Sequence, residues 1–196
     1  MTTFEIGIAL YQRVEELDFA GPYEVLTAWA RSSDRDIRVR TVADSDVIEC
    51  SHGLKVIPDA QWDDVGQLDL LVTPGGNIGD VQDDASFIGR LRDFASAGVL
   101  LTSVCNGAIL YANAGLLTGK RAATHWSAVE RLRQYDDVEV DESARFVDEG
   151  MVVTSAGVSA GIDMALHLVA RLDSDEMSAA VRRYIQYEPA PLRSDA

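Results

Sequence analysis

The chain has 196 residues, 47% of them hydrophobic, which is enough for one well-buried domain and short for two. Its 32 acidic and 17 basic residues give a net charge of −15, which disfavours nucleic acid as a partner. No apolar run approaches the ~18 residues that a membrane helix needs, and the N-terminus lacks the pattern of a secretory signal. We therefore expect a soluble, cytoplasmic protein with a single domain over residues 1–196 and no membrane partner.

The acidic charge comes with very few lysines. Lys55 and Lys120 are the only two, and arginine supplies the other basic residues. An acidic, lysine-poor surface is typical of proteins from a high-salt cytoplasm, where counterions screen the self-repulsion that destabilises a compact chain. We expect this halophile-like surface to lose structure in dilute buffer, whereas an ordinary acidic protein would keep its fold there.

Short apolar runs alternate with helical spacing along the chain. Strands are predicted over residues 4–10, 37–43, 68–73, 99–104, 138–140, 144–147 and 151–154, with a hairpin of 47–51 and 54–57. Helices are predicted from residue 18 to about 29, over 85–97, after residue 105, and over 126–135, 159–172 and 175–187, with an extended tail at 189–191. This alternation predicts an α/β fold, a parallel sheet sandwiched by helices.

Three segments with useful chemistry follow predicted strands. They are Leu17-Asp18, Pro74-Gly75-Gly76 and Cys105-Asn106-Gly107. Ligands bind at the carboxyl ends of strands in open α/β sheets, so the three segments are candidates for one site.

Cys105 lies where a buried-strand pattern changes to a helical one. Such a strand-to-helix elbow lifts the side chain above the sheet and points the N–H groups of the helix at the sulfur. A thiolate is favoured in that setting, and thiolates are the reactive form of cysteine. We interpret Cys105 as a nucleophile; the alternative is a buried cysteine that acts as a small hydrophobe.

Asp18 and the glycine pair each allow two interpretations. Asp18 could cap the first helix, or it could serve as a general acid if its carboxyl lies beside the sulfur. Gly75 and Gly76 could form a tight turn, or their backbone N–H groups could hold a developing anion.

The remaining candidate metal ligands are scattered in the sequence. The two cysteines, Cys50 and Cys105, have neither a CxxC partner nor zinc-site spacing, so we expect no disulfide. His52 in a turn and His167 on a helix face are interpreted as structural. Since no cluster of histidine, cysteine and carboxylate is visible, we expect no metal.

The motifs together resemble the ThiJ/PfpI superfamily, which has the flavodoxin-like, class I glutamine amidotransferase-like fold, and within it the isocyanide hydratases. The resemblance runs from residue 4 to about 191 and rests on four segments: LDFAGPYEVL (17–26), TPGGNIG (73–79), TSVCNGAILYANAGLLTGKRAATHW (102–126) and TSAGVSAGIDMALHLV (154–169).

The resemblance implies roles for several residues. Cys105 would be the nucleophile, Asp18 the acidic residue beside it, and Gly76, next to Gly75, an oxyanion-side donor. His125 and Trp126 would lie near the cysteine; His125 could instead cap a helix or belong to the core. The resemblance also implies a homodimer, a small-molecule substrate and no cofactor.

The implied reaction adds water to an isocyanide through a cysteine thioimidate and gives an N-substituted formamide. Isocyanide hydratases typically carry threonine after the nucleophile, where this chain has Asn106, so the substrate pocket differs. Two alternatives stay open. One is another cysteine enzyme of the superfamily, of the glyoxalase or amidase type. The other is a small-molecule or redox sensor related to the ligand domains of AraC-type regulators, although we expect no DNA-binding module here.

Overall fold

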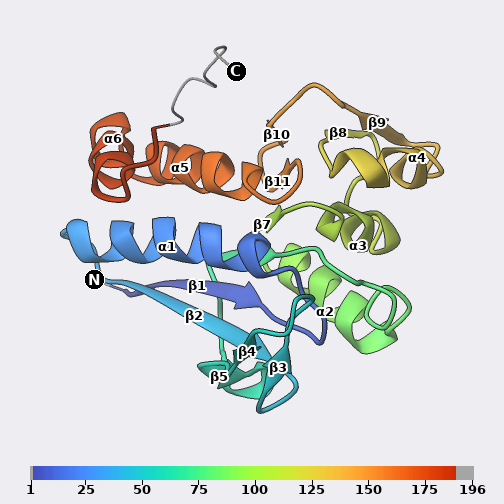
Figure 1. Ribbon diagram of the computed structural model, residues 1–196, viewed down its shortest axis with the longest axis horizontal. Helices are drawn as coiled ribbons and strands as arrows, with labels where there is room; N and C mark the ends of the chain where they lie inside the picture. The colour runs from blue at the N-terminus through green and yellow to red at the C-terminus, as the bar shows by residue number, and fades with distance from the viewer. Residues whose placement is uncertain (1, 189–196) are drawn as a thin grey trace, which may run out of the picture.

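A seven-stranded sheet forms the centre of the molecule, in the order β10-β11-β7-β6-β1-β2-β5. The computed structural model describes residues 2–188 (Figure 1). The strands are β1 (Phe4–Ala9), β2 (Ile37–Ala43), β5 (Ala60–Gln61), β6 (Leu70–Thr73), β7 (Leu100–Ser103), β10 (Phe146–Asp148) and β11 (Val152–Ser155). Neighbouring strands are parallel except β10, which runs antiparallel to β11.

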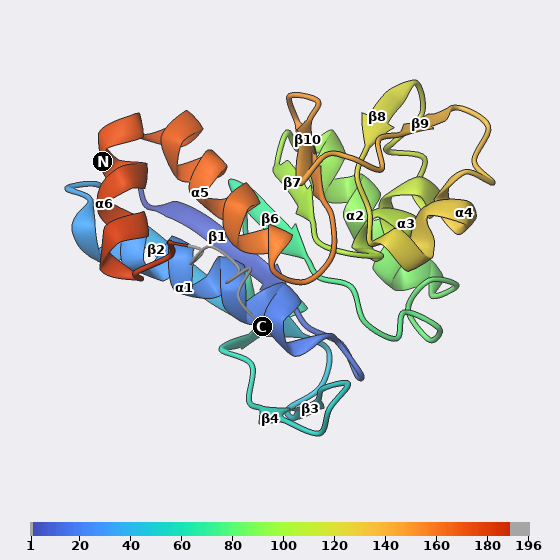
Figure 2. The same ribbon diagram turned by 45° about the horizontal axis from the view of Figure 1, so that its top comes forward.

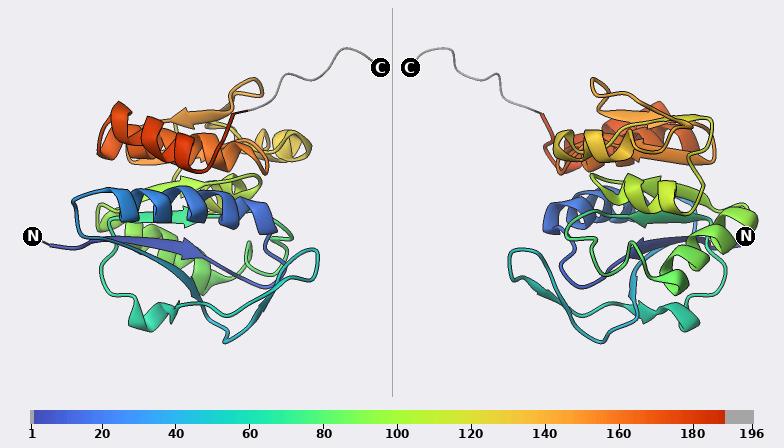
Figure 3. Two further views of the ribbon diagram at one scale, coloured as in Figure 1. Left: turned by 60° about the vertical axis from the view of Figure 1, so that its left-hand side comes forward. Right: turned by 90° about the vertical axis from the view of Figure 1, so that its right-hand side faces the viewer.

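Helices cover both faces of the sheet (Figures 2 and 3). One layer contains α1 (Glu16–Ser32), α5 (Ala160–Leu172) and α6 (Asp175–Tyr184), which pack against one another. The other contains α2 (Ala85–Ser96) and α3 (Gly107–Asn113). Because both faces are covered, every residue of β6, β7 and β11 is buried, which explains why each strand begins with an apolar pair and why the threonines and serines at their carboxyl ends are buried as well.

Glycine allows α1 and α5 to approach each other closely. A Cβ atom at Gly21 would lie 2.9 Å from Cγ1 of Ile162, and one at Gly161 would lie 3.2 Å from Cγ of Pro22. The first turns of α1, which include Asp18, are thereby held beside the loop that precedes α5.

Several smaller elements lie outside the central sheet. They are the antiparallel pair β3 (Ile48–Glu49) and β4 (Lys55–Val56), the parallel pair β8 (Lys120–Ala122) and β9 (Val138–Val140), the one-turn helix α4 (Val129–Leu132), and 3₁₀ turns at Trp62–Asp64 and Trp126–Ala128. Among the described residues, none of the helices has the length and apolar character needed to cross a bilayer.

The predicted α/β fold is confirmed, and most predicted elements are present within a few residues. The prediction missed β5 and β8, which are two and three residues long. It was wrong about a continuous helix over 126–135, because a 3₁₀ turn precedes a helix of only four residues there. The expectation for residues 189–191 lies outside the described residues.

Sequence order reverses in the sheet between β1 and β6. β2 and β5 lie on one side of β1, and β6, β7 and β11 lie on the other. At such a switch point the loops after neighbouring strands diverge and leave room for a ligand. The candidate site lies at this end of the sheet.

Candidate active site

Cys105 occupies the elbow between β7 and α3. Its φ of 60° lies in the left-handed region, which a residue other than glycine rarely adopts. Two contacts hold this conformation: the Cys105 N–H donates to Ala156 O at 3.1 Å, and the Thr124 hydroxyl donates to Cys105 O at 2.8 Å. The residue is 8% exposed and therefore belongs to the buried part of the molecule.

Asp18 lies in the first turn of α1 and is fully buried. Its Oδ2 accepts the Gly75 N–H at 3.0 Å, while Oδ1 is buried without a hydrogen-bond partner among the described residues. The N-cap of α1 is Glu15, so Asp18 does not cap the helix. A carboxyl group with one free oxygen beside a thiol is suited to proton transfer.

The two side chains strongly affect each other's titration. Burial raises the Asp18 pKa to about 7, the Gly75 N–H opposes this, and the charge of Glu15 adds to it. Burial, followed by the charge of Asp18, raises the Cys105 pKa to about 12. The proton therefore rests on sulfur in the free protein, with Asp18 as its nearby acceptor.

The raised pKa of Cys105 opposes the thiolate that was expected at the elbow. The N–H groups of Asn106 and Val158 do favour the anion, as a helix N-terminus should. They are outweighed because the sulfur is buried and shares its surroundings with a carboxylate.

Gly75 and Gly76 lie against the elbow, but their N–H groups already have acceptors. The Gly75 N–H is used by Asp18, and the Gly76 N–H donates to Asn106 Oδ1 at 2.9 Å. Asn106 Nδ2 in turn donates to Gly76 O at 2.8 Å. In this conformation Gly76 is not free to bind an oxyanion, and the free donors beside sulfur are the N–H groups of Asn106 and Val158.

Val158 is a site residue that sequence reasoning did not single out. Its φ of 51° is strained for a β-branched side chain, and its N–H acts on both Cys105 and Asp18. The sequence feature that could have pointed to this loop lies in the segment TSAGVSAGIDMALHLV, where Gly157 and Gly161 stand on either side of Val158.

His125 contacts this loop rather than the sulfur. A Cβ atom at Gly157 would lie 2.0 Å from His125 Cδ2, so the imidazole packs directly on the Gly157 backbone. His125 Nδ1 lies 2.7 Å from the Ser127 hydroxyl. Trp126 is 81% exposed, so it can contribute only to the rim of a pocket.

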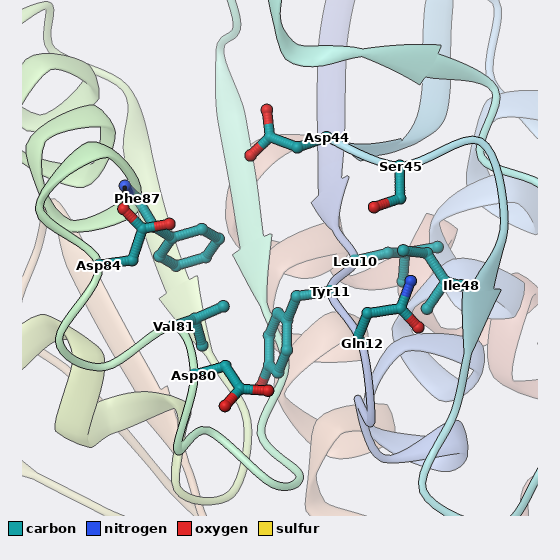
Figure 4. Close-up of a pocket in the computed structure, with 10 residues that line it drawn as sticks. All are labelled: Leu10, Tyr11, Gln12, Asp44, Ser45, Ile48, Asp80, Val81, Asp84 and Phe87. Atoms are coloured by element: carbon teal, nitrogen blue, oxygen red, sulfur yellow. Dashed lines mark hydrogen bonds between the residues drawn. The ribbon is translucent and has the colours of Figure 1, made fainter.

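A cavity of about 200 Å³ lies nearby at the carboxyl ends of β1 and β2 (Figure 4). Tyr11 forms part of its wall, and the Tyr11 hydroxyl donates to Pro74 O at 2.9 Å. Three carboxylates also line it, each with a partner: Asp44 pairs with Arg90, Asp80 pairs with Arg13, and Asp84 caps α2. These three carboxylates thus differ from Asp18, whose Oδ1 has no hydrogen-bond partner among the described residues.

The fold also creates a cluster that the sequence did not reveal. Glu15 and Glu16, at the start of α1, meet His52 from the turn between β3 and β4. His167, by contrast, stacks on Phe146 and pairs with Asp148 at 2.7 Å, a structural arrangement.

The DJ-1/PfpI family model matches residues 5–171. The chain belongs to the DJ-1/PfpI family. It is 35% identical to the isonitrile hydratase of Pseudomonas putida over 189 residues, which cover 95% of this chain and 80% of that protein. It is also 29% identical to the HTH-type transcriptional regulator GbdR of Pseudomonas aeruginosa, over 93% of this chain and only half of the regulator's length.

Solved structures agree with the family assignment. A ThiJ/PfpI family protein from Pseudomonas syringae aligns with a TM-score of 0.87 and 27% identity, covering all of this chain and 80% of that one. DJ-1beta of Drosophila melanogaster aligns with a TM-score of 0.85 at 22% identity, over 96% of this chain and all of that one, which shows a shared fold.

Proposed function

We propose that this DJ-1/PfpI protein is an isocyanide hydratase that uses Cys105 as its nucleophile and Asp18 as its proton carrier. The buried pair of Cys105 and Asp18, with one carboxyl oxygen left free, is the observation that carries the proposal. The similarity to an isonitrile hydratase over most of both chains supports it.

The first half of the reaction forms a covalent intermediate. As the sulfur of Cys105 attacks the terminal isocyanide carbon, its proton passes to the Asp18 carboxylate. The carboxylate is the weaker base of the two, so the transfer accompanies formation of the C–S bond, which lowers the basicity of the sulfur. Asp18 then delivers that proton to the same carbon. The product of this half is a thioimidate, with a C–S bond to Cys105 and a C=N bond to the substrate nitrogen.

The second half consumes water. Asp18, again ionised, takes a proton from a water molecule that adds to the thioimidate carbon. Asp18 passes this proton to the substrate nitrogen. The tetrahedral intermediate then expels sulfur as its C=O bond forms, its hydroxyl proton returns to sulfur through Asp18, and the N-substituted formamide leaves. The N–H groups of Asn106 and Val158 are the available donors for the charge that develops around sulfur.

Formamide production from a simple alkyl or aryl isocyanide tests the proposal, in both dilute buffer and molar KCl. Cys105→Ala should abolish turnover, and Asp18→Asn should reduce it by about 100-fold or more. Cys50→Ala, which removes the only other cysteine, is the matched control and should keep activity. Turnover that survives Cys105→Ala would exclude the mechanism.

A ligand sensor is the second candidate, because the chain also resembles the regulator GbdR over most of its length. In that case the folded protein would bind a small molecule near Cys105 without turning it over. Absence of formamide at both salt levels, with a folded protein, would favour this alternative.

A further inference from the structure

We propose that Glu15, Glu16 and His52 form a binding site for a divalent cation, with zinc as the best-suited ion. The two carboxylates and the imidazole each offer one ligand atom, and these atoms all lie within 4.8 Å of one another. Zinc sites are commonly built from imidazole nitrogen and carboxylate oxygen, with a further position left to water. An all-oxygen set would suit calcium or magnesium better.

The charges in this cluster favour a cation. Glu15 and Glu16 have His52 as their ion-pair partner, at 3.6 and 2.8 Å, and within residues 2–188 no arginine or lysine pairs with them. Arg13, although close in sequence, pairs with Asp80 instead. Two half-buried carboxylates, with side chains 24% and 20% exposed, thus share one imidazole, which carries no permanent charge.

The backbone already holds the ligands in place. The Ser51 N–H donates to Val14 O at 2.9 Å, and the His52 N–H donates to Glu16 Oε1 at 2.7 Å, so the turn is fixed to the start of α1. Zinc bonds of about 2.1 Å require donor atoms about 3.4 Å apart. Rotation of the His52 imidazole, which is 73% exposed, can supply this adjustment. The ion would replace the direct contact of 2.8 Å between His52 Nδ1 and Glu16 Oε2.

The site is connected to the candidate active site through the backbone. The Glu15 N–H donates to Gly75 O at 3.0 Å, and the Gly75 N–H donates to Asp18. A bound ion would hold Glu15 in place and thereby stiffen the Gly75 loop. Zinc binding itself does not depend on the proposed hydratase activity.

Isothermal titration with zinc chloride tests the site, using Cys105→Ala protein because the thiol beside Asp18 could itself bind zinc. We expect one ion per chain, and at least about tenfold weaker binding when His52→Gln is added. His167→Gln is the matched control, since His167 also pairs with a carboxylate, but one that Arg171 neutralises; it should leave binding unchanged.

A second variant and a second measurement distinguish a loss of zinc binding from a loss of folding. Glu16→Gln should weaken binding as His52→Gln does, and circular dichroism should show that both variants are folded. The chain has three histidines, so imidazole NMR can identify the ligand: zinc should shift the His52 signals and leave those of His125 and His167 in place. Equal affinity in all variants, no binding, or shifts at another histidine would overturn the proposal.

Discussion

Asn106 and Gly76 are joined by two hydrogen bonds, in which the side-chain amide of Asn106 both accepts from and donates to the Gly76 backbone. The residue after the nucleophile is thereby bound to the loop after β6. This pairing needs an amide, because threonine at this position could not satisfy both backbone groups in the same way.

Asn106→Ala should destabilise the fold by about 1–2 kcal/mol, because both Gly76 groups lose their partner. Urea unfolding at constant salt measures the change. Asn77→Ala is the control: within residues 2–188 the Asn77 side chain makes a single local hydrogen bond, to the Gly79 N–H at 3.2 Å, so its loss should cost much less. Equal losses in the two variants would argue against the pairing.

Gly75→Ala should disrupt the site. A Cβ atom there would lie 2.2 Å from Asn106 Oδ1 and 2.9 Å from Asp18 Oδ2, so it would push both away. We expect the unfolding free energy to fall by about 2 kcal/mol or more, and we expect activity to be lost as well. Gly89→Ala, in α2 and in open space, should instead be neutral or stabilise by about 0.5–1 kcal/mol.

The Asp18 carboxyl predicts a pH dependence of stability. Its pKa rises from 3.8 to about 7 on folding, so between these values the folded state binds a proton that the unfolded state lacks. Stability from this group is therefore greatest at low pH, is lost as pH rises from about 4 to 7, and falls most steeply, by about 1.4 kcal/mol per pH unit, in the middle of that window.

Asp18→Asn removes this titration. Wild type should lose stability relative to Asp18→Asn as pH rises through that window, as measured by urea unfolding at several pH values. A constant difference between the two proteins would show that Asp18 titrates in its ordinary range.

The raised pKa of Cys105 predicts slow alkylation of the free protein. In a Cys50→Ala background, the rate with iodoacetamide should keep rising with pH beyond pH 9, because the thiolate is scarce below that value. Asp18→Asn should speed alkylation at pH 8, since it removes the negative charge beside sulfur. A rate that levels off below pH 7 would instead indicate a thiolate in the resting protein.

The net charge of −15 predicts a dependence of stability on salt. At molar KCl the screening length falls to about 3 Å, so repulsion among the acidic side chains is largely removed. The urea midpoint should rise steeply between dilute buffer and molar KCl. A midpoint that is independent of KCl would identify an ordinary acidic protein.

Much of the architecture could be predicted from sequence because it depends on local pattern. The strands β6, β7 and β11 begin with apolar pairs that are buried because helices cover both faces, and the change of pattern at Cys105 marks the elbow. The short strand β5 was missed because two residues are too few to show the alternation of apolar and polar side chains that marks a strand.

The site was harder to predict because its properties arise from contacts between distant segments. Asp18 and Cys105 were correctly placed near the same edge, but the cost of burying the thiol could not be seen in the sequence. The positive φ of Val158 and the meeting of His52 with Glu16 likewise depend on the folded backbone.

Both edges of the central sheet are very short. β5 has two residues and β10 has three, so each offers few free backbone groups to an incoming strand. Long exposed edges serve as templates for strand addition between molecules, and short ones do not. The folded protein should therefore resist aggregation by edge-to-edge pairing of strands, even where salt has screened the charges that otherwise keep molecules apart.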